Sequence, residues 1–473
     1  MKQKNSSQPA TPTQQETGAP SPWVVFRLVV IATFLVSLDA TIVVAAFPAL
    51  RAEFSGSLPT TLSWVINAYT ITIAALLVPA GRLADLLGRK RLFLQGLALF
   101  LLGSLICGLA PNAAALIAAR VVQALGAALL TPASLALVLQ AFPKDKRAIA
   151  VSLWSVVGAL AAAVGPAVGS LVIELASWRW AFLINLPVGG FAWWLARQRL
   201  AESNSLEAGA RLDWFGITLI TACGSLVTLG IVQSQAWGWQ SWATWGSLGV
   251  GMAALVAYVP WARGRPSAAV DLSLFDDRTY RYVTLATLVF GVAFSMMFLS
   301  SFLFLMGIWQ FSQSLTGLAV TPGPLMVIPV AIASGRWAAR HGHRAILVAG
   351  GLLYAAAQLW LWWQAGPQPD YWRVWFPAQL AGGAAIGLLL PGLSGAAVAR
   401  LPPTRFGVGG AVNNAVRQLG GVLGTAIAVL LVGAANAPLA QFSHVFLVLA
   451  CVGVATALLA LPVDTRPVSK VGP

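Results

Sequence analysis

Charged side chains are scarce in this chain of 473 residues. Asp, Glu, Lys and Arg together make up 9% of it, against about 25% in an ordinary soluble domain. Hydrophobic residues make up 58%, and the mean hydropathy is +0.79. A soluble fold of this size cannot bury so much apolar surface. The composition therefore excludes a soluble globular protein and predicts a polytopic membrane protein.

Cysteines are rare, and nucleotide-binding motifs are missing from the sequence. The 3 cysteines, Cys107, Cys223 and Cys451, lie in or beside apolar stretches without metal-ligand spacing, so we expect them to be small core residues. The lack of a Walker motif argues against ATP as the energy source. No grouping of His, Cys and carboxylates resembles a catalytic centre. We therefore expect no enzymatic activity, no metal and no cofactor.

Long apolar stretches are what the chain has in abundance. Each is long enough for the ~20 residues that cross a bilayer, so we expect an all-α membrane protein with fourteen transmembrane helices. The expected spans lie at about 24–48, 62–80, 92–110, 113–141, 148–174, 179–196, 214–234, 243–262, 282–309, 316–335, 345–364, 374–398, 406–434 and 441–461.

Basic residues are distributed very unevenly between the two sides of these spans. Of the 29 Lys and Arg residues, only Arg51, Arg179 and Arg373 fall on the side opposite the N-terminus, and Arg120 and Arg417 fall within spans. This asymmetry is the positive-inside pattern, so both termini are expected to be cytoplasmic. The net charge of +15 is then a topology signal, and no nucleic-acid partner is expected.

Three short sequence matches indicate an internal repeat. GRLADLLGRKR at 81–91 matches GRWAARHGHR at 335–344, and GPAVG at 165–169 matches GGVLG at 420–424, at offsets of 254 and 255 residues. QALGAA from Gln123 matches QLAGGA at an offset of 256. These offsets correspond to eight spans, whereas the duplicated unit holds six. Two extra helices are therefore expected between two six-helix halves.

The expected domain organisation follows from this repeat. The Gln/Ser/Thr/Pro-rich start has no signal-peptide pattern and is expected to be a disordered tail. The expected segments are a disordered cytoplasmic tail at 1–22, an N-terminal six-helix bundle at 23–200, two extra transmembrane helices with linkers at 201–280, a C-terminal six-helix bundle at 281–463 and a cytoplasmic tail at 464–473.

Several motifs together resemble those of a known transporter family. They are LDATIVVAAFP (38–48), WVINAY (64–69), GRLADLLGRKR (81–91), RVVQALGAALLTP (120–132), GPAVG (165–169) with WRWAFLINLPVG (178–189), and NNAVRQLGGVLG (413–424). On these residues the chain resembles the major facilitator superfamily, and within it the 14-span drug:proton antiporters of the EmrB/QacA type. The resemblance implies a major facilitator fold, with two six-helix bundles, two inserted linker helices and a substrate site near the membrane midplane.

Asp39 is the acid that stands out, because it lies within an apolar span. A charge there costs several kcal/mol, so its default interpretation is functional; a buried carboxyl hydrogen-bonded to a neighbouring helix remains the alternative. The repeat places no acid opposite it, near Phe294. Arg120 lies within another span and is either a structural ion-pair partner or, as the resemblance implies, part of proton coupling with Asp39.

The loop motif at 81–91 combines an acid with cations at a tight turn. Gly81 and Gly88 permit close approach and chain reversal, and Asp85 can accept hydrogen bonds from an arginine such as Arg89 or from a helix N-terminus. An ordinary positive-inside loop is the alternative. The resemblance implies a cytoplasmic gate. In the second copy Ala339 replaces the acid, and His341 and His343 are expected to be solvated.

A glycine-rich motif lies in the fifth span. It consists of Gly158, Gly165, Pro166 and Gly169. Proline bends a helix and the glycines offer a flat packing face, so packing alone is one interpretation. The resemblance implies that this motif marks antiporters, which favours efflux over uptake.

Polar and aromatic residues inside the spans are candidates for a substrate cavity. The candidates are Trp64, Asn67, Tyr69, Gln123, Trp154, Trp309, Gln310, Asn413, Asn414 and Arg417. Arg417 could pair with Asp39, hold substrate or bond across helices. One acid and two arginines lie within the spans, so a dicationic substrate is disfavoured. Neutral lipophilic, singly charged or anionic amphiphilic substrates are favoured.

These observations predict proton-coupled efflux of lipophilic small molecules or drugs by alternating access, in the cytoplasmic (inner) membrane of a bacterium. The expected partners are the lipophilic substrate, protons and the lipid bilayer, with a periplasmic adaptor if the source is Gram-negative. A dedicated exporter of one endogenous amphiphile, such as a lipid, siderophore or pigment precursor, is the alternative. A non-transporting membrane receptor is a further class, but no cytoplasmic loop is long enough for an output domain.

Overall fold

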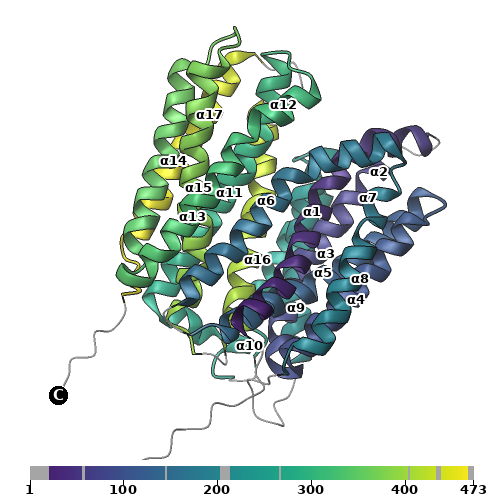
Figure 1. Ribbon diagram of the computed structural model, residues 1–473, viewed down its shortest axis with the longest axis vertical. Coiled ribbons are helices and arrows are strands. Elements are labelled where there is room, and N and C mark those ends of the chain that lie inside the picture. Colours follow the sequence, from purple (N-terminus) through teal and green to yellow (C-terminus); the bar gives the residue numbers. More distant parts are fainter. Residues whose placement is uncertain are drawn as a thin grey trace, which may run out of the picture.

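The computed structural model describes residues 21–55, 59–143, 146–202, 213–265, 268–402, 405–432 and 438–466. Within these ranges the secondary structure is helical, with short connections and no strand. Figure 1 shows long helices running roughly side by side, as expected for a protein that crosses a membrane repeatedly.

The first part of the chain forms long helices joined by short ones. They are α1 (Pro22–Glu53), α2 (Pro59–Leu62), α3 (Trp64–Leu87), α4 (Arg89–Gly108), α5 (Ala113–Ala141), α6 (Arg147–Leu175), α7 (Trp180–Leu183) and α8 (Asn185–Arg199). A helix pair follows, α9 (Trp214–Trp237) and α10 (Trp242–Ala262).

The second part repeats this plan. Its elements are a 3₁₀ turn η2 (Leu272–Asp276), α11 (Arg278–Gly307), α12 (Gln313–Val320), α13 (Pro322–His341), α14 (Arg344–Gln364), a π-helical turn η3 (Tyr371–Trp375), α15 (Phe376–Ala399), α16 (Phe406–Val432) and α17 (Leu439–Ala460).

Twelve helices in the described part of the chain are long and apolar enough to cross a membrane. The protein is therefore a multi-pass membrane protein, as the composition predicts. The expected count of fourteen is not confirmed. In α6 the described apolar run, Ile149–Gly158, is too short to be counted as a span, and α8 has only 15 residues.

The helices of the two parts pack in matching pairs. In the first part α1 packs on α6, α4 on α5, α3 on α5, and α8 on both α1 and α4. In the second part α11 packs on α16, α14 on α15, α13 on α15, and α17 on both α11 and α14. The same pairings recur, so the sequence repeat corresponds to a repeat in helix packing.

The equivalent helices α6 and α16 bring the two parts together. Helix α6 packs on α13 and α15, and its counterpart α16 packs on α3 and α5. In Figure 1, α6 and α16 accordingly lie between the purple-to-blue helices and the green ones. The boundary between the two parts is therefore formed by α3, α5, α6, α13, α15 and α16.

The α9–α10 pair lies beside this arrangement. The two helices pack on each other, and α9 also packs on α3 and α16. A Cβ at Gly224 on α9 would come within 3.0–3.3 Å of the Ala74 and Ala75 backbone, so the α9–α3 contact depends on a small residue.

Glycines end α3 and α13 at corresponding positions. Gly88 and Gly342 have φ values of 101° and 79°, a left-handed conformation that favours glycine. Each glycine reverses the chain between a pair of antiparallel helices. The expected sharp turn at Gly88 therefore has a conformational cause, and the repeat preserves it.

Candidate functional site

Asp39 and Arg120 form an ion pair inside the first part. Arg120 Nη1 on α5 donates to Asp39 Oδ2 on α1 over 2.6 Å, and the two side chains are 1% and 0% exposed. Arg120 Nε also donates to the Val65 carbonyl on α3 over 3.1 Å. The ion pair thus joins three helices, and the two buried charges compensate each other.

Amide side chains complete the hydrogen bonding of this carboxylate. Gln123 Nε2 donates to Asp39 Oδ1 over 2.7 Å, and Gln123 Oε1 accepts from Arg120 Nη1 over 2.6 Å. Asn185 Nδ2, at the start of α8, donates to Asp39 Oδ1 over 3.2 Å. Both amides also donate to Ser104 Oγ on α4. We refer to Asp39, Arg120, Gln123, Asn185 and Ser104 as the carboxylate cluster.

Aromatic rings cover the arginine. The Arg120 guanidinium lies 3.9 Å from the centroid of the Tyr69 ring and 5.7 Å from that of Phe182, so cation–π attraction adds to the ion pair. Two buried polar atoms next to the cluster, Tyr69 Oη and Asn185 Oδ1, have no hydrogen-bond partner among the described residues. Asn185 Oδ1 is an unused acceptor, which a protonated carboxyl group needs as the partner of its O–H.

The sequence identified only part of this cluster. Asp39 and Arg120, which the sequence pairs, form its ion pair, and the cavity candidates Gln123 and Tyr69 lie at this ion pair. Asn185 and Ser104 were missed as site residues. Asn185 belongs to WRWAFLINLPVG, and a lone Asn in an apolar segment is the signal that could have identified it.

A second cluster joins the two parts at the other end of α3. Arg89 Nη2 donates to Asp85 Oδ1 over 3.2 Å, and Arg89 Nη1 donates to Gln140 Oε1 on α5 over 3.1 Å. The Val408 backbone N–H, in the first turn of α16, donates to Asp85 Oδ2 over 3.1 Å. The carboxylate therefore lies at a helix N-terminus, where backbone N–H groups and the helix dipole stabilise an anion.

Two glycines permit this close contact between α3 and α16. A Cβ at Gly407 would lie 2.5–2.7 Å from the Asp85 carboxylate, and one at Gly81 would collide with Ala411. Any larger residue at either position would separate the helices. We refer to Asp85, Arg89, Gly81, Gly407 and the Val408 N–H as the α3–α16 contact.

The second copy of the loop motif has a different chemistry. Ala339 and His343 occupy the positions of Asp85 and Arg89. The expectation that His343 is solvated is wrong, because the side chain is 5% exposed. Its Nδ1 lies 2.9 Å from Thr465 Oγ1 and its backbone N–H donates to the same oxygen. Burial lowers the pKa of His343 to about 4, so the imidazole is neutral at neutral pH.

The glycine motif of α6 faces α1. A Cβ at Gly169 would lie 2.7 Å from Ile42 Cγ1, and one at Gly165 would collide with Thr41. Gly158 leaves more room, with Ser37 Oγ 3.4 Å from a Cβ. Two of the three glycines are thus needed for close packing beside Asp39. The side chain of Pro166 lies outside the described residues.

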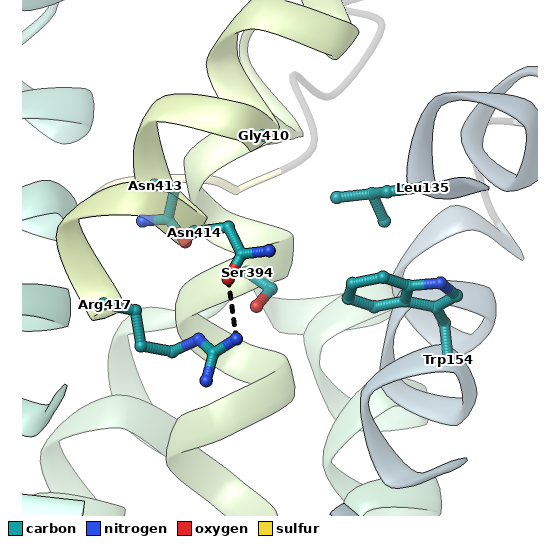
Figure 2. Close-up of a pocket in the computed structure, with 7 residues that line it drawn as sticks. All are labelled: Leu135, Trp154, Ser394, Gly410, Asn413, Asn414 and Arg417. Carbon is teal, nitrogen blue, oxygen red and sulfur yellow. Dashed lines mark hydrogen bonds between the residues drawn. The ribbon is translucent and has the colours of Figure 1, made fainter. Parts of the chain in front are cut away.

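A small pocket lies where the two parts meet (Figure 2). It is lined by Leu135, Trp154, Ser394, Gly410, Asn413, Asn414 and Arg417. Figure 2 shows Leu135 and Trp154, from α5 and α6, facing the side chains of α16 across the space. Trp154 Nε1 donates to Ser134 Oγ over 3.2 Å, and Thr33 on α1 contacts the same hydroxyl over 3.4 Å. The pocket is thereby connected to the helix that carries Asp39.

Four of the cavity candidates lie here and others do not. Trp154, Asn413, Asn414 and Arg417 line the pocket. Trp309 is buried among Phe304, Phe311 and Trp375, and Gln310 is exposed. Trp64 and Asn67 lie in the first turn of α3 and do not line this pocket. Arg417 does not pair with Asp39, since Asp39 is bonded to Arg120.

Comparison with known proteins identifies the fold and its relatives. The profile of the Major Facilitator Superfamily matches residues 29–268 and 283–473. The cephamycin export protein CmcT of Amycolatopsis lactamdurans is 34% identical over 449 residues, covering 92% of this chain and 90% of that protein. The multidrug resistance protein Stp of Mycobacterium tuberculosis is 32% identical over 398 residues, covering 83% of this chain and 73% of that protein.

A solved structure shares the fold at low sequence identity. The human organic anion transporter MFSD10 superposes with a TM-score of 0.69 at 17% identity, covering 93% of this chain and all of that one.

Proposed function

This chain belongs to the major facilitator superfamily, a family of transporters and not of enzymes, and we propose that it exports lipophilic small molecules in exchange for protons. The relatives named as exporters or resistance proteins, similar over most of both chains, support the efflux direction. The observation that carries the proton-coupling part is the Asp39–Arg120 ion pair, buried in a membrane-spanning bundle with its amide partners. A carboxylate in such a place is a site for reversible protonation.

Protonation of Asp39 would change the balance of charge in the carboxylate cluster. The proton neutralises the partner of Arg120, which keeps its bonds to Gln123 Oε1 and the Val65 carbonyl and its contact with the Tyr69 ring. A half-turn of the Asn185 amide would bring its unused Oδ1 acceptor toward the new O–H. These changes act on the contacts of α1 with α5 and α8, and so can alter how the helices pack.

The α3–α16 contact is the proposed cytoplasmic gate. The hydrogen bond from the Val408 N–H to Asp85 links the two parts at that end, and Arg89 holds the Asp85 carboxylate within the first part. In this proposal the arrangement is therefore a state closed toward the cytoplasm. Opening requires Asp85 to leave the α16 N-terminus. In this proposal α6 supplies the antiporter motif, Gly158, Gly165, Pro166 and Gly169, and Gly165 and Gly169 set the distance to α1.

The finer topology also belongs to this proposal. The two spans beyond the twelve would be α6, whose 29 residues give roughly 43 Å of helix, and the nearly continuous α7–α8 segment. The bundles would then be 23–200 and 281–463, with the α9–α10 pair in 201–280 and tails at 1–22 and 464–473. The basic-residue pattern supports cytoplasmic termini in a bacterial inner membrane.

A dedicated exporter of one amphiphile remains the second candidate. The similarity to a cephamycin export protein, whose name specifies one natural product, favours it. A periplasmic adaptor stays a proposal for a Gram-negative source.

The test is transport by the purified protein in liposomes with an imposed pH gradient. A panel of lipophilic cations, anions and neutral compounds is compared in the wild type and Asp39→Asn. The proposal expects gradient-dependent flux of at least one compound in the wild type and its loss in the variant. Flux that ignores the gradient would refute proton coupling, and a narrow panel response would favour the dedicated exporter.

A further inference from the structure

Arg417 is a cation inside a membrane-spanning helix, and among the described residues its side chain is hydrogen-bonded to Asn414 alone. It lies in the span Phe406–Val432, where an unpaired charge is costly. Arg417 Nη2 donates to Asn414 Oδ1 over 2.6 Å, and none of the ion pairs in the described part of the chain involves it. An amide oxygen accepts the hydrogen bond but leaves the positive charge uncompensated.

No acid among the described residues forms an ion pair with this arginine. Residues 278–369 and 371–463 contain neither Asp nor Glu. In the other half, Asp39 is bonded to Arg120, Gln123 and Asn185, and Asp85 is bonded to Arg89 and the Val408 N–H. Arg120 and Arg417, the two arginines deep in the spans, therefore differ in kind, because only the first has a carboxylate partner.

Packing directs the Arg417 side chain to the pocket. A Cβ at Gly291 on α11 would lie 2.6 Å from the Arg417 carbonyl oxygen, so the backbone of α16 is pressed against α11. The guanidinium lies with Asn414 at the pocket, with the Trp154 ring across the space (Figure 2). Asn413 donates to Thr287 Oγ1 on α11. Among the residues that line the pocket, Arg417 is the charged one.

We propose that Arg417 binds the anionic group of a lipophilic substrate, such as a carboxylate or a sulfonate. This rests on the proposed function and narrows its substrate class. The guanidinium presents paired N–H donors to a two-oxygen anion, and Trp154 and Leu135 offer an apolar wall for the rest of the molecule. A dication would be repelled, and a neutral molecule would leave the charge of Arg417 uncompensated.

The pocket must widen to accept such a molecule. Its volume here is about 20 Å³, enough for about one water molecule. The lining residues come from both halves, so separation of α6 from α16 enlarges the site. Binding of the anion would therefore respond to the same movement that alternates access.

Matched ligands test the proposal without a variant. The probes are 2-naphthalenesulfonate, the neutral 2-naphthalenesulfonamide and a naphthylmethyl trimethylammonium cation, which share an apolar body. Binding to purified wild-type protein is measured by fluorescence at pH 7. The sulfonate is expected to bind with the highest affinity, about tenfold or more tighter than the sulfonamide, and the cation with the lowest affinity. Equal binding of anion and amide, or no binding of the anion, overturns the proposal.

Variants then assign the preference to Arg417. Arg417→Gln should weaken sulfonate binding about tenfold or more and leave sulfonamide binding unchanged, which also reports that the variant is folded. Arg417→Lys should recover part of the preference. Arg373→Gln removes an exposed arginine outside the pocket and should leave the affinities for sulfonate and sulfonamide unchanged. A parallel loss for sulfonate and sulfonamide in Arg417→Gln would show a structural role only.

Flux separates this inference from the proposed function. If the sulfonate binds through Arg417 but no panel compound moves with the pH gradient, the proton-coupled function fails and the anion site stands. If gradient-driven flux occurs without any anion preference, the function stands and the anion site is refuted.

Discussion

Replacing Asp39 by Asn removes one charge from the carboxylate cluster and preserves the shape of the side chain. At the observed 2.6 Å between Arg120 Nη1 and Asp39 Oδ2, the Coulomb attraction is roughly 6 kcal/mol at an effective dielectric constant of about 20. Relief of the Asp39 desolvation cost offsets part of this loss. A net destabilisation of about 3–5 kcal/mol is expected, as for other buried pairs that lose one member.

Hydrogen bonding adds to the effect. The Asp39 carboxylate accepts from Arg120, Gln123 and Asn185, whereas an asparagine has one acceptor oxygen and turns an NH₂ toward the remaining donors. At least one donor of the cluster must therefore lose its acceptor. Asp39→Asn should accordingly unfold at lower temperature and lose gradient-driven flux.

A double-variant cycle provides the assay. Thermal unfolding in detergent is compared for the wild type, Asp39→Asn, Arg120→Gln and the two changes together. The two destabilisations should be strongly non-additive, because the second change removes the charge that the first leaves unpaired. Additive effects, together with full coupled flux in Asp39→Asn, would refute the assignment of this pair.

Three further predictions concern the remaining features. Asn185→Leu should leave the ion pair in place but shift the pH dependence of transport, measured as flux against pH, because Asp39 loses one hydrogen-bond donor and an unused acceptor beside it; an unchanged profile would contradict this. Gly407→Ala should force Asp85 away from the α16 N-terminus and open the proposed gate, so cysteines should be labelled faster by a reagent added on the cytoplasmic side. Gly382→Ala is the control, because a Cβ there meets nothing within 4 Å. The contact between His343 and Thr465 should weaken in acid. The pKa of His343 is lowered to about 4 from about 6.5, so this contact is fully stable above about pH 6.5 and loses stability as the pH falls toward 4. Hydrogen exchange near Thr465 should become faster over this pH range, and His343→Gln should remove the pH dependence.

The internal repeat was the most informative feature of the sequence for the fold. The matches at 81 and 335 correspond to equivalent turns at Gly88 and Gly342, and the equivalent helices pair in the same way. Periodic apolar stretches and their offsets are properties of the chain alone, so the helical plan could be read from them. The number of spans could not be fixed in the same way, because α8 has only 15 residues and the described apolar run of α6 is short.

Side-chain partners were harder to predict. Arg120 and Arg417 look alike in sequence, and only the packing of α1 on α5 decides that Asp39 pairs with Arg120. Asn185 reaches Asp39 from a helix 146 residues later in the chain. Trp309 and Trp154 are both aromatic residues in spans, yet one lies in an aromatic cluster and the other lines the pocket. Such choices depend on tertiary contacts that no local pattern encodes.

Proton movement driven by substrate tests the central claim most directly. Liposomes containing the wild-type protein and a trapped pH dye receive a gradient of the permanently charged panel compound with the largest flux, with no initial pH gradient. The account predicts that protons move opposite to the substrate in the wild type and do not move in Asp39→Asn. Substrate flux in the wild type without any change in luminal pH would contradict it.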